Sequence, residues 1–246
     1  MYYDKAKFSM YSQNGEDGIL NRLMQELGVR LQSSWSVDVG AYDGISYSNI
    51  LSLINQEGNA ILIEPCMVGG GCEPKYSKLK ELPQKFPKVT TINCAVVPET
   101  FTEEKINEII GYLVSMENNC GVNREEEMKA DTLDSLLEDT KLPEDYDVLN
   151  IDTDISSDHE IWQSHKKYKP KIVVIEINSS ISPESDIEMD AGSPSFNLSL
   201  KIGNELGYSL VCHTGNMIYV RNDLLDKLSI PKSLINSVEL FNRSWL

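Results

Sequence analysis

The chain has 246 residues, 41% of them hydrophobic, and a formal net charge of −16 at pH 7. This length and apolar fraction suit one α/β domain with a buried core. We do not expect so acidic a chain to bind nucleic acid, because a phosphate backbone requires a basic face. We also expect no membrane association, since no apolar stretch is long enough to span a bilayer and the first residues do not resemble a signal peptide.

The chain contains five dispersed cysteines, Cys66, Cys72, Cys94, Cys120 and Cys212. No two of them form the C-x-x-C pair that is typical of a zinc site. We therefore expect reduced thiols in a cytoplasmic protein. Cys66 and Cys72 flank a glycine-rich loop, so a disulfide between these two is the less favoured alternative.

The first predicted helix spans residues 16–27, where apolar side chains recur at helical spacing. Its first turn carries Glu16 and Asp17, and acids there interact favourably with the helix dipole. With Gln13, however, they form a denser polar cluster than a helix start requires. We therefore favour an interpretation in which these three residues also contact a ligand.

The central motif of the sequence is a strand, a glycine-containing turn and a helix within residues 35–56. Gly40 lets the backbone approach a ligand closely, because it has no Cβ atom. Asp38 and Asp43 in the same motif would repel a pyrophosphate. They would accept a ligand with a cationic end and ribose hydroxyls, and S-adenosylmethionine has both. Ser48 begins the helix, whose N–H groups point at the same place.

The next predicted strand, residues 59–65, ends in Glu64. This carboxylate lies roughly twenty residues after the glycine turn, the spacing at which nucleotide-binding βαβ units place a ribose-binding acid. The alternative is a surface residue at a strand end. A glycine run at 69–71 follows and predicts a flexible loop, because no Lys-Ser/Thr pair completes a phosphate loop.

Two later predicted strands, residues 146–152 and 171–178, both end in polar groups. Ligands of open α/β sheets bind at the carboxyl ends of the strands, so these groups should converge on one edge. The residues concerned are Asp152, Asp154, Glu176 and Asn178.

The remaining segments complete the predicted fold. Residues 89–97 form a strand, 102–119 are partly helical with a possible strand near 113–116, and 208–220 form a hairpin. The alternation of strands and helices predicts a doubly wound, mostly parallel sheet with helices on both faces and an antiparallel C-terminal hairpin. We expect a single domain made of a helical cap (1–30), a core (31–220) and a C-terminal extension (221–246).

Four stretches of the chain carry a resemblance to a known family. They are YSQNGEDGI at 11–19, VDVGAYDG at 37–44, ILIEP at 61–65 and VLNIDTD at 148–154. They resemble the FkbM-type branch of the Rossmann-like methyltransferases, which use S-adenosylmethionine to methylate hydroxyl groups, often on sugars. The resemblance implies that residues 13–17 lie against the cofactor and that Asn93 lies beside the adenine. At Asp152–Asp154 the chain is similar to a variant subgroup of the family with the pattern Ile-Asp-x-Asp-Gly, but it lacks the glycine after Asp154.

The predicted chemistry is methyl transfer to an acceptor hydroxyl, which requires alignment of the reactants and removal of a proton. Asp152, Asp154 and Asp158 lie close enough to repel one another unless they are protonated or share a cation. One interpretation is a Mg²⁺ or Mn²⁺ ion, held by the four polar groups at the strand ends, that lowers the pKa of the hydroxyl. The equally weighted alternative is that one acid faces the site while the others cap the next helix. His159 is a further candidate base, alongside Asp152 and Asp154.

The sequence thus predicts an S-adenosylmethionine-dependent O-methyltransferase with a small-molecule or glycan acceptor. A methyltransferase-like module that only binds its partner is the alternative, because the glycine after Asp154 is missing. An NAD-binding oxidoreductase is a third, less favoured hypothesis, since Asp38 and Asp43 occupy the turn that would receive the phosphates. Nothing in the sequence indicates the oligomeric state.

Overall fold

The protein is built around a seven-stranded sheet in the order β10-β11-β7-β6-β1-β2-β3. The computed structural model describes residues 2–124, 126–153, 155–190 and 192–246, with the backbone alone for Asp4. Within this part, β11 runs antiparallel to β7 and β10, and the other neighbouring pairs are parallel. The strands are β1 (Trp35–Val39), β2 (Asn59–Ile63), β3 (Val89–Ile92), β6 (Val148–Ile151), β7 (Ile172–Glu176), β10 (Tyr208–His213) and β11 (Asn216–Arg221). The predicted fold class is therefore confirmed, including the antiparallel C-terminal hairpin.

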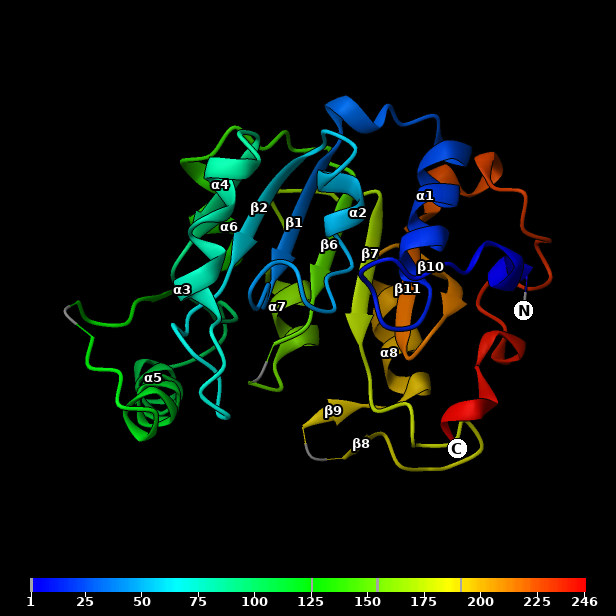
Figure 1. Cartoon of the computed structure of the whole chain (residues 1–246). Coiled ribbons are helices and arrows are strands. Elements are labelled where there is room, and N and C mark those ends of the chain that lie inside the picture. The colour runs from blue at the N-terminus through cyan, green and yellow to red at the C-terminus, as the bar shows by residue number, and fades with distance from the viewer. Residues whose placement is uncertain (1, 125, 154, 191) are drawn as a thin grey trace.

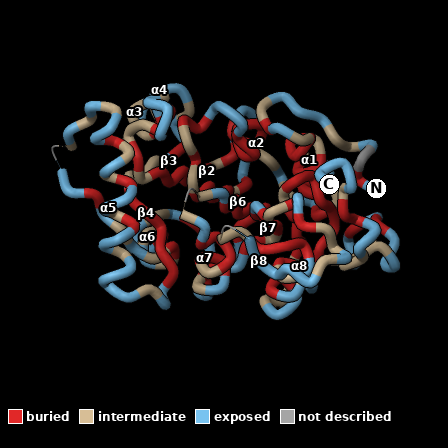
Figure 2. The backbone as a smooth tube through the Cα atoms, turned by 90° about the horizontal axis from the view of Figure 1, so that it is seen from below, coloured by how far each residue is buried: buried red, intermediate tan, exposed pale blue. Residues whose placement is uncertain are grey.

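Helices cover both faces of this sheet. Figure 2 shows α1 to α4 on one side of the strands and α6, α7 and α8 on the other, with buried backbone between them. The helices are α1 (Glu16–Leu27), α2 (Leu51–Ile54), α3 (Tyr76–Leu79), α4 (Leu82–Lys85), α5 (Glu103–Asn119), α6 (Leu133–Glu138), α7 (Asp158–Ser164) and α8 (Phe196–Glu205). Short 3-10 helices are Tyr2–Ala6, Leu31–Ser33, Asn222–Lys227, Val238–Leu240 and Arg243–Trp245. No helix of the described residues has the length and apolar character needed to cross a membrane.

The segment between β3 and β6 differs from the prediction in two ways. The predicted strand over 89–97 stops at Ile92, and a separate two-stranded sheet pairs β4 (Ala95–Val96) with β5 (Ala130–Asp131). The possible strand near 113–116 is wrong, because residues 103–119 form one helix, α5. The Thr102 side chain caps this helix, and its acidic first turn suits the helix dipole. These signals at the start of the helix outweigh the local β-propensity near its end.

Helix α5 packs beside the sheet and not on either of its faces. In Figure 1 the parallel strands run downward, and both α5 and the β8–β9 hairpin (Met189–Asp190 and Ser193–Pro194) lie below their ends. A second, smaller core joins α5 to the rest of the chain. Its buried members are Cys66, Ala95, Val97, Ile109, Leu113 and Met128. The helix thus lies near the carboxyl ends of the parallel strands, where ligands of this fold class bind.

A disulfide between Cys72 and Cys120 ties this helix to the loop after β2. Both cysteine predictions are therefore wrong: the thiols are not all reduced, and the partner of Cys72 is not Cys66. Cys120 is 48 residues further along the chain, at the C-terminal end of α5, and its Cα lies 5.3 Å from that of Cys72. Cys66, Cys94 and Cys212 are buried and do not take part in this disulfide.

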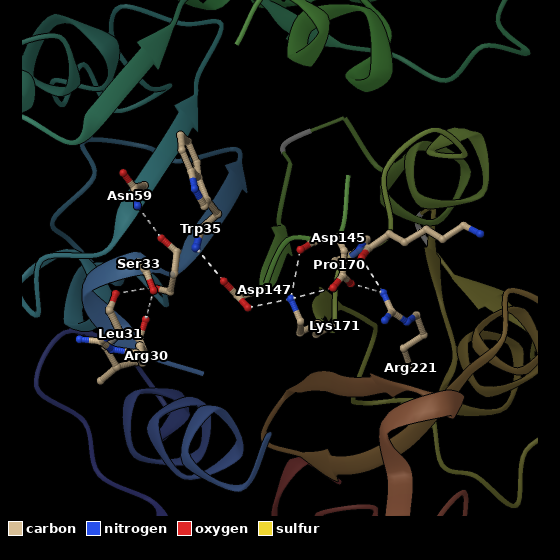
Figure 3. A network of polar contacts seen from close by, with 12 residues as sticks. Arg30, Leu31, Ser33, Trp35, Asn59, Asp145, Asp147, Pro170, Lys171 and Arg221 are labelled. Carbon is tan, nitrogen blue, oxygen red and sulfur yellow. Dashed lines mark hydrogen bonds and ion pairs between the residues drawn. The ribbon is translucent and has the colours of Figure 1, made fainter. Parts of the chain in front are cut away.

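At the other end of the strands, where β1, β6 and β7 begin, a polar network holds the sheet together (Figure 3). The Asp147 carboxylate accepts a hydrogen bond from the backbone N–H of Trp35 (2.8 Å) and pairs with Lys171 Nζ (3.0 Å). Arg221 pairs in turn with Asp145 (2.8 Å). These contacts connect the starts of β1, β6 and β7, so this network serves to align the strands.

Candidate functional site

The carboxyl ends of β1, β2 and β6 surround a cavity of about 180 Å³, which we call the central cavity. Five of the residues predicted to bind a cofactor line it. They are Gln13, Asp38, Gly40, Ser48 and Glu64, and the predicted catalytic residue Asp152 joins them. Further residues complete the wall, among them Tyr42, Asn49, Lys75, Cys94, Val96, Leu113, Asn150 and Ile155. The cavity therefore lies where α/β sheets bind their ligands.

The turn after β1 brings the backbone to the cavity in a strained conformation. Gly40 has φ +82°, and a Cβ atom added there would lie 1.8 Å from the backbone oxygen of Asp152. The glycine is thus required by the neighbouring β6 segment as well as by any ligand. Tyr42 and Tyr47 have φ of 54° and 60°, values that cost energy for non-glycine residues and tend to occur at functional sites.

Asp43 stabilises this turn from within. Its carboxylate accepts hydrogen bonds from the N–H groups of Ile45 (2.9 Å) and Ser46 (2.7 Å) and from the Ser46 hydroxyl (3.0 Å). Asp43 is not among the residues that line the central cavity. The structure therefore gives Asp43 a role in shaping the turn, and it does not support the predicted direct contact with a cofactor.

A buried chain of hydrogen bonds forms the floor of the cavity. Asn49 Nδ2 donates to Asn150 Oδ1 (3.0 Å), and Asn150 Nδ2 donates to Asp38 Oδ1 (2.7 Å). Burial raises the pKa of Asp38 to about 7, and the nearby Asp152 carboxylate adds to the shift, while the Asn150 hydrogen bond opposes it. The group therefore changes charge near neutral pH. We did not predict the two asparagines, although Asn150 is a polar residue inside an otherwise apolar strand.

Glu64 lies on one side of the cavity with its carboxylate fixed by the chain. Its oxygens accept hydrogen bonds from the backbone N–H groups of Tyr42 (3.1 Å) and Cys66 (3.0 Å). Lys75 Nζ lies 3.9 Å from Glu64 Oε1, and both side chains are buried. Lys75 could not be predicted from the sequence, because its loop is marked there only by a glycine run.

Asn93 does not reach the cavity, contrary to the prediction that it binds an adenine. Its Nδ2 group donates to the backbone oxygens of Glu64 and Pro65, each at 2.8 Å, and its Oδ1 accepts from Arg124 (3.2 Å). Arg124 is held in turn by the buried carboxylate of Glu117. The neighbouring residue, Cys94, lines the cavity instead. Asn93 thus supports the strand end that presents Glu64.

The N-terminal cluster is divided between two roles. Gln13 lines the central cavity. The Glu16 carboxylate accepts hydrogen bonds from the Thr214 hydroxyl (2.6 Å) and the Asn14 N–H (2.8 Å). The Asp17 carboxylate accepts three backbone N–H groups, those of residues 10, 11 and 12. Both acids are fully buried and hold the N-terminal loop, so the structure does not support them as ligand contacts.

A second opening of about 390 Å³, which we call the side crevice, adjoins the central cavity. Gln13 and Asp152 line both spaces. Glu176 and Asn178 line the side crevice, so the predicted convergence of these strand ends is confirmed for Asp152, Glu176 and Asn178. Asp154, the other residue predicted there, lies outside the described residues.

The metal prediction finds no support in this arrangement. Among the described residues, no three side chains of the types His, Cys, Asp and Glu lie close enough to hold an ion. The Asn178 side-chain oxygen already accepts from the N–H and hydroxyl of Ser180, at 3.1 and 2.6 Å. We therefore assign no step to a divalent ion.

His159 lies away from the central cavity and does not match the predicted base. Its Nε2 atom is 2.7 Å from the Ser199 hydroxyl, which in turn lies 2.9 Å from the Tyr219 hydroxyl. Burial lowers the pKa of His159 to about 4, so the imidazole is neutral at pH 7. The neighbouring Asp158 accepts the backbone N–H of Thr153 (3.2 Å). Asp158 thus joins the start of α7 to the segment after β6, and His159 joins α7 to α8.

Comparisons with known proteins found distant likenesses only. No protein-family model matches the chain, and no curated protein matches it either. Among solved structures, a proposed O-methyltransferase from Klebsiella pneumoniae is 12% identical over 88% of this chain and 84% of its own, with a TM-score of 0.46. An O-methyltransferase of Bacillus cereus in complex with SAH is 14% identical, covering 89% and 86%, with a TM-score of 0.39. An O-methyltransferase of Streptomyces achromogenes, involved in tomaymycin synthesis and in complex with SAM, is 11% identical, covering 89% and 94%, with a TM-score of 0.38.

These values are too low to carry an inference about this chain. The fold is assigned from the strand order of the sheet, and the residues that line the central cavity and the side crevice are the basis for function.

Proposed function

We propose that the protein is an S-adenosylmethionine-dependent methyltransferase. The observation that carries this proposal is that two buried acids, Asp38 and Glu64, line one cavity at the carboxyl ends of the adjacent strands β1 and β2. One acid suits the cationic methionine end of the donor, and the other suits its ribose hydroxyls. The glycine turn between them permits a close backbone approach.

The walls of the central cavity suggest how each part of the donor is held. The Asp38, Asn49 and Asn150 side chains form a polar floor for the α-ammonium and carboxylate groups. An apolar wall of Cys94, Val96, Leu113 and Ile155 offers a surface for the adenine. A ring of this kind is recognised mainly through apolar contact, with few polar groups. The residues present therefore fit the donor, although Asn93 is not one of its contacts.

The side crevice is the proposed acceptor site, since it shares Gln13 and Asp152 with the wall of the central cavity. Bound S-adenosylmethionine supplies an electrophilic methyl group on a sulfonium. The chain must align an acceptor hydroxyl with it and accept the proton. Asp152 is the described acid that lines both openings, so we propose it as that base.

We propose a hydroxyl of a sugar or another small molecule as the acceptor. Polar side chains of the side crevice, among them Asn14, Asn178 and Ser180, are suited to hydrogen-bond such a molecule. A cytoplasmic location remains a prediction, and the Cys72–Cys120 disulfide weighs against it because stable disulfides are rare in reducing compartments.

Ligand titration followed by a transfer assay tests the proposal. Calorimetric titration with S-adenosylmethionine, S-adenosylhomocysteine and NAD should show binding of the first two only. Transfer of a radiolabelled methyl group to a panel of nucleotide sugars and glycans should then identify the acceptor. Binding of NAD alone would replace the proposal with an oxidoreductase. Donor binding without transfer to any panel member would favour a module that binds but does not catalyse.

A further inference from the structure

Lys75 is the one basic side chain among the described residues that line the central cavity. It is only 6% exposed. Its Nζ atom lies 3.9 Å from Glu64 Oε1 and 5.4 Å from the centroid of the Tyr42 ring, within the range of a cation–π interaction. Lysine is rarely buried to this extent without a charged partner, because desolvation of an ammonium group is costly. The burial of Lys75 in the wall of the cavity therefore indicates a role there.

The loop after β2 places Lys75 firmly. The chain folds back on itself through a bridge between Val68 and Pro74, and the Lys75 N–H donates to the Met67 oxygen (2.9 Å). The tip of this loop is held by the disulfide from Cys72 to the end of α5. The loop that carries Lys75 is therefore held at several points, and it positions the ammonium group at the wall of the cavity.

We propose that Lys75 is a positioning residue for donor binding, acting through Glu64. This inference rests on the proposed function, in which Glu64 receives the ribose hydroxyls. Two backbone N–H groups already fix the Glu64 oxygens on the protein side. The ammonium group offsets the cost of burying the carboxylate and holds it in one orientation toward the cavity. Charge-assisted hydrogen bonds to the ribose, which are stronger than neutral ones, then become available.

A purely structural role for Lys75 makes a different prediction. If the side chain only anchors the loop, its loss should weaken every ligand of the cavity alike. If it acts through Glu64, its loss should weaken only ligands that present both ribose hydroxyls. The discrimination between ribose and deoxyribose therefore separates the two roles.

The test measures the affinity of the full-length protein for S-adenosylhomocysteine and for its 2′-deoxyribose analogue by calorimetry. The wild type should prefer the ribose form by roughly ten- to a hundredfold, which corresponds to about one hydrogen bond to a charged group. Lys75→Met should bring this ratio close to one by weakening the ribose form alone. Lys75→Arg should keep most of the preference. Lys78→Met removes the same charge at an exposed position in α3 and should leave the ratio unchanged.

Each outcome decides the question. An unchanged ratio in Lys75→Met, or an equal loss for both ligands, overturns the positioning role. If Lys75→Met does not fold, Lys75→Gln provides the comparison with Lys75→Arg, and an unchanged ratio in Lys75→Gln again overturns the role. If the wild type binds S-adenosylhomocysteine but the Lys75 variants do not change the ribose preference, only the role of Lys75 is overturned, and the proposed function is unaffected. A wild-type protein that does not bind S-adenosylhomocysteine overturns both.

Discussion

The Cys72–Cys120 disulfide should contribute substantially to the free energy of unfolding. It closes a loop whose ends are 48 residues apart. In the chain-entropy description, a bridge lowers the entropy of the denatured chain by about 2.1 + 1.5R ln n cal/mol/K, where n is the loop length. For this loop the value is about 14 cal/mol/K, or about 4 kcal/mol at 25 °C. The smaller core and the Glu117–Arg124 pair connect the bridged segments to the sheet, so we expect one cooperative transition.

Urea unfolding with and without a dithiol reductant measures this contribution. The reductant passes two electrons and two protons to the bridge, which becomes two thiols while the dithiol becomes a cyclic disulfide. A Cys72→Ala/Cys120→Ala double variant is the control, and its stability should not respond to the reductant. In the folded protein Cys66 and Cys94 should not exchange with the bridge, because burial raises the pKa of each thiol to about 12 and keeps it protonated and unreactive.

A difference of less than about 1 kcal/mol between oxidised and reduced wild-type protein, far below the entropic value, would contradict this contribution of the disulfide. An equally strong response of the double variant to the reductant would contradict it as well. A separate early transition in the reduced protein alone would show that α5 and its loop unfold apart from the sheet, contrary to the expected single transition.

The remaining predictions concern the site. Glu64→Gln should weaken binding of S-adenosylhomocysteine by about 1.5–3 kcal/mol, whereas the exposed Glu81→Gln should change nothing measurable by calorimetry. Burial raises the pKa of Asp38 to about 7, so its charged form is gained as the pH rises, and donor affinity should increase about fivefold from pH 6 to 7. Because the pKa of Asp38 is higher in the folded than in the unfolded chain, the free energy of unfolding should fall as the pH rises from about 4 to 7. Both the change in affinity and the change in stability should vanish in Asp38→Asn. Gly40→Ala should lower Tm as well as affinity, because its Cβ would meet the Asp152 backbone oxygen, and unchanged melting would contradict this packing. Asp152→Asn should abolish methyl transfer while donor affinity is kept, and full turnover would exclude Asp152 as the base.

The sequence alone was sufficient for the elements that depend on local pattern. Apolar runs ending in a glycine or an acid predicted β1 and β2, and the helix over 16–27 followed from its spacing. Gly40 and Glu64 were found in this way, because their positions relative to strand ends are set within one βαβ unit. The convergence of Asp152 with Glu176 followed from the rule that parallel strands end at a common edge.

Tertiary structure decided which side chains reach the cavity and which are used to hold the chain. Asn93 and Asp43 looked like ligand contacts, yet their polar atoms are taken up by nearby backbone and side-chain groups. Asn150 meets Asp38 across 112 positions of sequence because β6 lies beside β1 in the sheet. The Cys72–Cys120 pair joins a loop to the end of a helix 48 residues later. Local pattern carries no information on such pairs, since they depend on the order of strands and on how a helix packs beside the sheet.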